Sequence, residues 1–150
     1  MTSDSEGGLL NEYVGITAWS SEAITRRGQL VKLDTSGLGP TGINKYSICD
    51  AGEEPDGAAF ITTLNAITRT YDANKEFTVN GLLNGIEIAF PLGDTHAALA
   101  IGDKVKVING GLVDKYTTGA AWLVGKAEQP KTENEGGYVR VRVFKEEKTA

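Results

Sequence analysis

The chain has 150 residues, a formal net charge of −5 at pH 7 and one cysteine. The acidic balance argues against nucleic acid as a partner, because affinity for phosphates depends on clustered Lys and Arg side chains. A single cysteine excludes an intrachain disulfide, and no apolar stretch approaches the roughly 20 residues that span a membrane, so no membrane partner is expected. The length fits one domain, and the 19 glycines favour strands and turns over helices.

Residues 1–22 are predicted to form an extended N-terminal arm, ahead of a single β-rich domain at residues 23–150. The first 25 residues contain no Lys or Arg but four acids, together with apolar side chains that need a packing partner: Leu9, Leu10, Tyr13, Val14, Ile16 and Trp19. Two interpretations are open. The segment is a strand that packs on its own domain, or it is an arm that orders on a neighbouring subunit or on a larger assembly. The opening MTSDSEGG lacks the basic start and apolar core of a secretory signal, so synthesis in the cytosol of the producing cell is expected.

Within residues 23–33, Arg26-Arg27-Gly28 is predicted to form a turn into a strand, and further strands are predicted at residues 45–50 and 58–64. Pro55-Asp56-Gly57 sets the turn before the third strand, because proline fixes φ and glycine tolerates positive φ. Ala58 and Ala59 in that strand are small enough to let another backbone or another subunit approach closely.

The middle of the chain carries a hairpin signal and a helix signal. Asn84-Gly85 predicts a β-hairpin within residues 77–90, because Asn-Gly is the strongest short-range signal for a two-residue hairpin turn. Residues 94–100 begin with Asp94, a good N-cap, and continue with helix formers. One short helix is therefore predicted there.

Four more strands are predicted in the second part, at residues 104–108, 112–116, 120–126 and 138–144, with a loop at 128–137 and a solvated end at 145–150. The last strand alternates strictly between Val and Arg, which places its valines on one face and its arginines on the other. Gly28-Gln29-Leu30-Val31-Lys32 and Gly102-Asp103-Lys104-Val105-Lys106 open two units that each end on a Gly-Ala-Ala-aromatic run. This weak repeat indicates two related β units. The expected fold class is mainly β, a small β-barrel or sandwich-like domain with one short helix.

Residues that could carry chemistry are few. His96 is the only histidine, and no serine lies in a Gly-x-Ser-x-Gly elbow. One Cys and one His are too few for a typical zinc site. The acidic run at 50–56 lacks the spacing of an EF-hand loop, which favours a solvated turn over a calcium site. We therefore expect no catalytic residue, no metal and no cofactor, and we expect Cys49 to be a buried, unreactive thiol.

Arg140 and Arg142 project from one face of the strand that begins at Tyr138. On one interpretation they pair with Glu side chains of a neighbouring strand. On the other they form a basic stripe that meets an acidic patch of an adjacent subunit through charge-assisted hydrogen bonds. The second interpretation makes Arg140, Arg142 and Tyr138 the predicted oligomer contacts.

GQLVKLDTSG at 28–37, YSICD at 46–50 and DGAAFI at 56–61 together resemble the core of the head decoration, or capsid cement, proteins of tailed phages, in particular the lambda-type members. LAIGDKV at 99–105 and GAAWLVG at 119–125 are similar to a broader set of small phage capsid-stabilising proteins. The similarity spans residues 24–125. The sequence departs from the lambda-type pattern in the insertion GLGPTGIN at 37–44 and in a charged tail after residue 126.

The resemblance implies a structural protein rather than an enzyme. It implies a homotrimer on the exterior of the virion, at threefold or quasi-threefold sites of the assembled, expanded head, where it bridges subunits of the major capsid protein. It also implies that the N-terminal arm contacts the capsid, through Leu9, Leu10, Tyr13, Val14, Ile16 and Trp19. The alternative is a small β-barrel ligand-binding or accessory enzyme domain, with a cleft near Trp122 and the 50–56 turn that holds a sugar or a peptide.

Overall fold

A computed structural model of the chain describes residues 15–60 and 73–150. These residues form β-strands and irregular connections and contain no helix, which confirms the mainly β prediction. The strands are β2 (Gly15–Ser20), β3 (Leu30–Leu38), β4 (Asn44–Ile48), β5 (Gly57–Phe60), β6 (Glu76–Gly81), β7 (Glu87–Pro91), β8 (Lys104–Ile108), β9 (Leu112–Lys115), β10 (Ala121–Ala127) and β11 (Tyr138–Lys148).

The first strands close into a small barrel in the order β2-β4-β3-β5-β6, which we call the barrel unit. β2 closes it, because it pairs in parallel with β4 on one side and antiparallel with β6 on the other. Apolar side chains fill the interior: Ala18, Ile24, Val31, Tyr46, Ile48, Ala59, Phe77 and Val79. The barrel that the sequence predicted is therefore present, built from the first half of the domain.

The remaining strands form a sheet in the order β7-β11-β10-β8-β9, which we call the sheet unit. β11 alternates as predicted, since Val139, Val141 and Val143 are fully buried while the arginines between them are exposed. It also runs on to Lys148, so the predicted solvated end is mostly strand. A parallel bridge between Leu92 and Val113 brings the two ends of this sheet together, which gives it a rolled shape around its own core.

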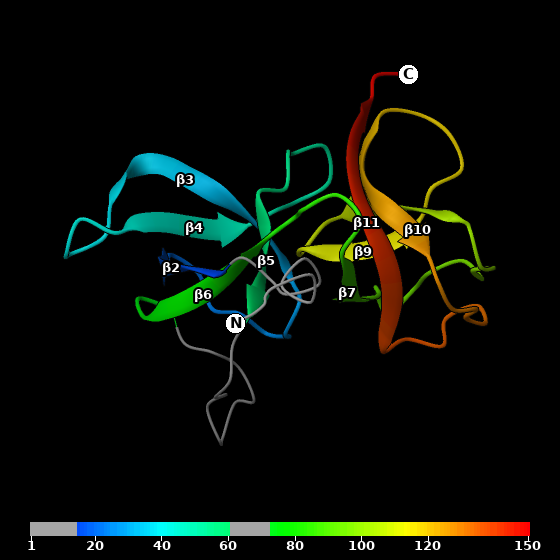
Figure 1. The fold of residues 1–150 in the computed structure, drawn as a ribbon, viewed down its shortest axis with the longest axis horizontal. Helices are drawn as coiled ribbons and strands as arrows, with labels where there is room; N and C mark the ends of the chain where they lie inside the picture. Colours follow the sequence, from blue (N-terminus) through cyan, green and yellow to red (C-terminus); the bar gives the residue numbers. More distant parts are fainter. Residues whose placement is uncertain (1–14, 61–72) are drawn as a thin grey trace, which may run out of the picture.

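The two units lie side by side in Figure 1 and share buried side chains at their junction. Leu30, Cys49 and Ala58 come from the barrel unit but belong to the core cluster of the sheet unit. Their neighbours in sequence, such as Val31 and Ala59, point into the barrel instead. The barrel wall is therefore buried on both faces here, which explains why Leu30-Val31 and Ala58-Ala59 read as consecutive apolar pairs rather than as an alternation.

The hairpin predicted at residues 77–90 is wrong, although its turn exists. Ile86 N donates to Leu83 O (3.3 Å) and Gly85 has a φ of +92°. The flanking strands nevertheless separate, because β6 pairs with β2 and β5 in the barrel while β7 pairs with β11 in the sheet. The turn is thus the link between the two units.

The short helix predicted at residues 94–100 is also wrong. Side chains elsewhere in the fold bind the backbone N–H groups of this segment: His96 N donates to Asn134 Oδ1 (2.8 Å), and Ala97 N donates to Asp114 Oδ1 (3.0 Å). Leu99 forms an isolated bridge with Lys131. These contacts hold the backbone extended, so tertiary hydrogen bonds override the weak local preference for a helix.

The predicted N-terminal arm is described only from Gly15 onward. Residues 15–20 are β2, a strand of the barrel, so Ile16 and Trp19 belong to the folded domain. The arm boundary predicted at residue 22 therefore falls after this strand and not before it. Ile16 still exposes 45% of its surface. Leu9, Leu10, Tyr13 and Val14 lie outside the described residues, as does the end of the strand predicted at 58–64.

Candidate interaction surfaces

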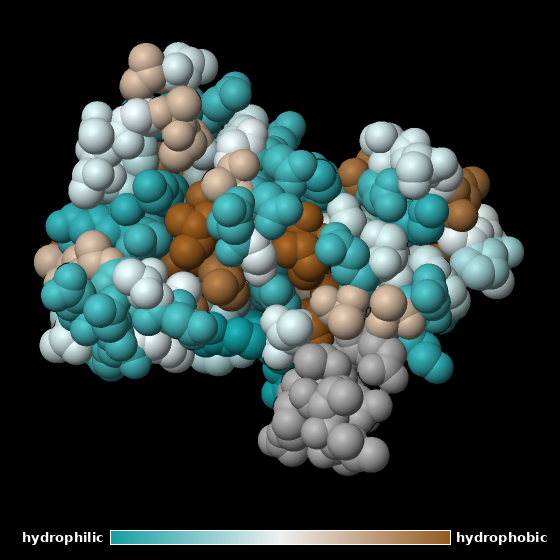
Figure 2. Space-filling view, turned by 180° about the vertical axis from the view of Figure 1, so that it is seen from behind, coloured by the Kyte–Doolittle hydropathy of each residue, from teal (hydrophilic) through white to brown (hydrophobic). Residues whose placement is uncertain are grey.

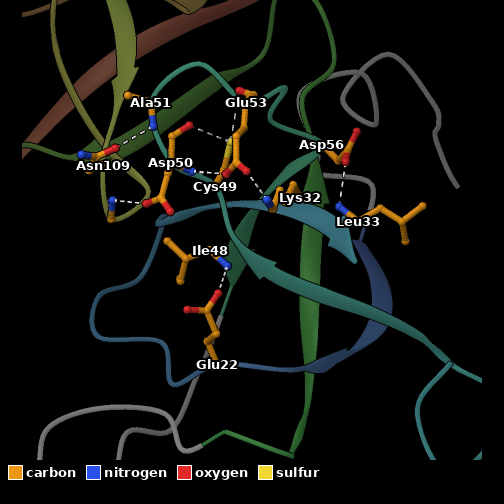
Figure 3. A network of polar contacts seen from close by, with 11 residues as sticks. Glu22, Lys32, Leu33, Ile48, Cys49, Asp50, Ala51, Glu53, Asp56 and Asn109 are labelled. Atoms are coloured by element: carbon orange, nitrogen blue, oxygen red, sulfur yellow. Dashed lines mark hydrogen bonds and ion pairs between the residues drawn. The ribbon is translucent and has the colours of Figure 1, made fainter. Parts of the chain in front are cut away.

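The β8–β9 turn, Asn109-Gly110-Gly111, attaches the sheet unit to the barrel unit. Leu30 N donates to Gly111 O (2.8 Å), and Gly111 N donates to Cys49 O (2.9 Å). Gly110 N donates to Asp50 Oδ1 (2.8 Å), as the network in Figure 3 shows. Backbone groups of one unit therefore complete the hydrogen bonding of the other, which fixes the relative position of the two.

The acidic run at 50–56 contains an exposed turn, as predicted, and its carboxylates also take part in this network. Glu53 forms an ion pair with Lys32 and accepts a hydrogen bond from Asp50 N (2.8 Å). Asp56 Oδ2 accepts a hydrogen bond from Leu33 N (2.7 Å). Among the described residues no cluster of three or more His, Cys, Asp or Glu side chains gathers that could hold a metal ion.

Acid should weaken the fold in part through Glu53. The Lys32 ammonium, and then the backbone N–H of Asp50, hold the pKa of this carboxyl below its ordinary value of 4.5. Because the folded-state pKa is lowered, the stabilisation is complete above the ordinary pKa and is lost as the pH falls through the folded-state value. We expect Glu53→Gln to lower the free energy of unfolding at pH 7 by up to about 1 kcal/mol. The effect is limited because the side chains of Glu53 and Lys32 are partly exposed and water screens their attraction.

The same variant should show a shallower fall in stability between neutral pH and the acid side of the Glu53 pKa, measured by urea unfolding at several pH values. Glu133→Gln is the matched control, because the Glu133 carboxylate makes no ion pair within the described part of the chain. An equal acid slope for the wild type and for Glu53→Gln would contradict the assigned role.

Cys49 is fully buried, as the sequence predicted, and burial raises the pKa of its thiol to about 12. The thiolate is the nucleophile in thiol chemistry, so the native protein holds this group in an inert form. We expect no reaction with an aromatic disulfide reagent at pH 8 in buffer and one thiol titrated after unfolding in urea. Rapid reaction of the native protein would show that the junction between the units opens.

His96 is 2% exposed and binds backbone groups through both ring nitrogens. Gly136 N donates to Nε2 (2.8 Å), so Nδ1 carries the hydrogen and donates to Ala97 O (2.8 Å). Neither ring nitrogen bonds a serine or a carboxylate. The imidazole therefore joins the 94–100 segment to the 128–137 loop.

Arg140 and Arg142 pair with Glu side chains of neighbouring elements, as the first interpretation predicted. Arg142 binds both oxygens of Glu128 (Nε–Oε2 3.2 Å, Nη2–Oε1 2.9 Å) and lies 3.8 Å from Glu87, which is also 4.0 Å from Arg140. Tyr138 is 38% exposed, and the Arg26 guanidinium lies 5.0 Å from its ring centroid. The oligomer contact proposed for these three residues stays a prediction.

Trp122 and the 50–56 turn do come together, although they are far apart in the sequence. Lys145 lies between them: its Nζ is 2.9 Å from Glu54 Oε2, 3.1 Å from Pro55 O and 5.8 Å from the Trp122 ring centroid. Lys145 therefore contacts both of the features beside which the alternative function placed a ligand.

A groove of about 460 Å³ runs along the junction of the two units. Figure 2 shows apolar residues gathered where the two lobes meet. The described residues that line the groove are Arg27, Gly28, Ala58, Ala59, Phe60, Asn80, Ile86, Glu87, Ile88, Ala89 and Tyr138. The sequence analysis missed this feature, because the only signal was the pair of small residues Ala58-Ala59 and the opposite wall comes from β7.

No protein-family model matches the chain, and no curated protein matches it in sequence. The fold, however, has a counterpart among solved structures: the N base of head fiber gp8.5 in bacteriophage phi29, with a TM-score of 0.62, 16% identity, and coverage of 87% of this chain and 93% of that one. The chain has the fold of a phage head-fiber base. At 16% identity the likeness establishes the shared fold and nothing further.

Within the described ranges no helix has the length and apolarity needed to cross a membrane.

Proposed function

We propose that this chain is an accessory structural protein of a tailed-phage head, which binds the outside of the assembled shell and stabilises it by bridging subunits of the major capsid protein. The observation that carries the proposal is the fold shared with a phage head-fiber base over nearly the whole of both chains. The resemblance of residues 24–125 to head decoration proteins supports the same class independently, because it was drawn from sequence motifs alone.

The physical mechanism needs no catalytic residue. A protein that binds the expanded lattice but not its free subunits stabilises the lattice by mass action. Each contact can be weak, because many copies act together on one shell. Once a copy is bound to one capsid subunit, its binding to the next subunit is an intramolecular event. A rigid scaffold suits this role, and the hydrogen bonds from the 109–111 turn to Leu30, Cys49 and Asp50 hold the two units in one arrangement.

The test is co-sedimentation of the purified chain with assembled, expanded heads of the phage that encodes it. We expect binding to expanded heads, little binding to free capsid subunits, and release of packaged DNA at a higher temperature from decorated heads. Equal binding to free subunits and to heads would contradict stabilisation by mass action, and an absence of binding to heads would contradict the function itself.

A homotrimer is part of the proposal. Sedimentation equilibrium of the free protein should give a mass near three times 15.9 kDa. Such a trimer would match the threefold sites implied by the resemblance, whereas a monomer at every concentration would contradict it.

A further inference from the structure

The groove between the two units has an open strand edge as one wall. β7 forms a ladder only with β11, and the bridge to β9 begins just beyond its end, at Leu92. Val143 N donates to Ile86 O (2.8 Å). Backbone groups in an antiparallel pair point toward the partner strand at every second residue, so the even-numbered residues of β7 are the ones that bond to β11. The N–H and C=O groups of Glu87 and Ala89 therefore point away from β11, toward the groove that both residues line.

Part of this edge is covered and part is open. A Cβ at Gly28 would lie 2.5 Å from Ala89 O, so the barrel unit already packs against that carbonyl. The N–H groups of Glu87 and Ala89 donate to no described residue, and the C=O of Glu87 accepts no hydrogen bond from one. Open backbone groups of this kind form the template on which a strand of another segment is added.

Asn80 gives the groove a second, independent feature. Its side chain is 7% exposed and lines the groove, and its Oδ1 atom has no hydrogen-bond donor. Buried polar atoms in folded proteins are almost always bonded, so an unpartnered one in a groove wall marks a place where a bound group donates. An extended segment in the groove can supply that donor from its backbone or from a side chain.

The N-terminal segment of this protein has the chemistry that the groove needs. Residues 1–14 contain three acids and no Lys or Arg, together with the apolar side chains of Leu9, Leu10, Tyr13 and Val14. At the Tyr138 end of the groove, the Arg26 guanidinium donates to the carbonyl oxygens of Leu92 and Gly137 and has no carboxylate partner among the described residues. Ile88 and Tyr138, the second of which is 38% exposed, line the groove and offer contact to apolar side chains.

The position at which the segment leaves the fold also fits. Gly15 pairs with Asn80, so the chain departs at the rim of the groove, and 14 residues reach as far as about 45 Å when extended. Every copy thus presents the start of its segment and its open edge on the same side of the molecule. This arrangement allows copies related by a rotation axis to exchange strands.

We propose that the groove binds the N-terminal segment, residues 1–14, of a second copy of this chain, which adds a strand to the open edge of β7. The contact is head-to-tail, with the segment of one copy in the groove of the next, so it closes into a ring such as the trimer considered above. Of the two partners that the sequence left open for the segment, the groove favours the neighbouring subunit over the shell. The inference does not depend on binding to heads.

The test uses full-length variants that disable one half of the contact each. Leu9→Asp with Leu10→Asp removes the apolar side chains of the segment, and Ser3→Asp with Ser5→Asp adds the same charge outside them as a control. Ala89→Pro removes a donor that faces the groove and leaves the ladder to β11 intact. We expect sedimentation equilibrium to show an oligomer for the wild type and the serine control, and a 15.9 kDa monomer for each disabled variant.

Mixing the two disabled variants should give a one-to-one dimer but no larger ring, because one variant keeps an intact groove and the other an intact segment. Peptide binding tests the groove without the Ala89→Pro variant. A fluorescent peptide with the sequence of residues 1–14 should bind the chain that carries Leu9→Asp and Leu10→Asp, whereas the same peptide with both leucines changed to Asp should not bind. The proposal is overturned if the wild type is monomeric at every concentration. A segment that binds the groove of its own chain would give that result. It is equally overturned if the leucine variant keeps the wild-type mass, or if both peptides bind alike.

Discussion

Gly111→Ala should cost the protein roughly 3 kcal/mol or more of its free energy of unfolding. Gly111 has a φ of +70°, a conformation that is strained for alanine, and a Cβ there would lie 2.6 Å from Leu30 O and 3.0 Å from Leu30 N. Those are the backbone atoms of the residue to which Gly111 is hydrogen bonded across the junction. The added methyl group therefore has to push the two units apart. Urea unfolding, followed by tryptophan fluorescence, measures the loss.

Gly110→Ala is the matched control for this substitution. Its φ of +84° carries a similar backbone strain, but a Cβ at this position would meet only the side chain of Leu112, at 3.8 Å. We expect a cost of about 1 kcal/mol, from the conformation alone. The difference between the two variants then measures the close approach of the units. Equal losses would show that the junction is loose enough to absorb a methyl group.

Leu30→Ala should destabilise both units together, by about 3 kcal/mol. Leu30 is fully buried and lies in the core cluster of the sheet unit, although it belongs to a barrel strand. Removing its side chain leaves a cavity between the units that neither can fill alone. Leu38→Ala, in the same strand at a position 62% exposed, is the control and should cost no more than about 0.5 kcal/mol.

The two tryptophans allow each unit to be followed separately. Trp19 lies in β2 of the barrel unit and Trp122 in β10 of the sheet unit. In Trp19→Phe and Trp122→Phe backgrounds, the remaining tryptophan should report the same urea midpoint, and Leu30→Ala should shift both midpoints equally. Midpoints that differ would mean that the units unfold independently and that the buried junction does not couple them.

Local signals in the sequence were sufficient for much of the fold. The alternation of Val139, Val141 and Val143 identified β11, and the apolar setting of Cys49 identified a buried thiol. The Pro55-Asp56-Gly57 motif misplaced its turn, which lies at residues 50–53, where Gly52 has a φ of +83° and Glu53 N donates to Asp50 O, while Gly57 begins β5. The Asn-Gly motif located its turn correctly. Each of these features depends on a few consecutive residues, because side-chain direction in a strand and positive φ in a turn are decided within one short segment.

The features that sequence analysis missed all depend on distant residues. The helix expected at 94–100 was displaced by side chains of Asn134 and Asp114, and neither can be assigned to that segment from its own residues. The pairing partners of β6 and β7 were likewise undetermined, because a turn motif does not state whether its flanking strands stay together. The groove, with Asn80 on one wall and β7 on the other, could not be predicted for the same reason.

The sequence by itself determined that this protein is mainly β, and it pointed to the class of phage head proteins through short motifs. Only the tertiary structure decided that the strands divide into a closed barrel and a rolled sheet, that a loop of one completes the hydrogen bonds of the other, and that an open strand edge borders their junction. The reason is physical. Alternation and turn geometry are encoded locally, whereas the choice of a strand's partner follows from which apolar faces can be buried together, and that is a property of the whole chain.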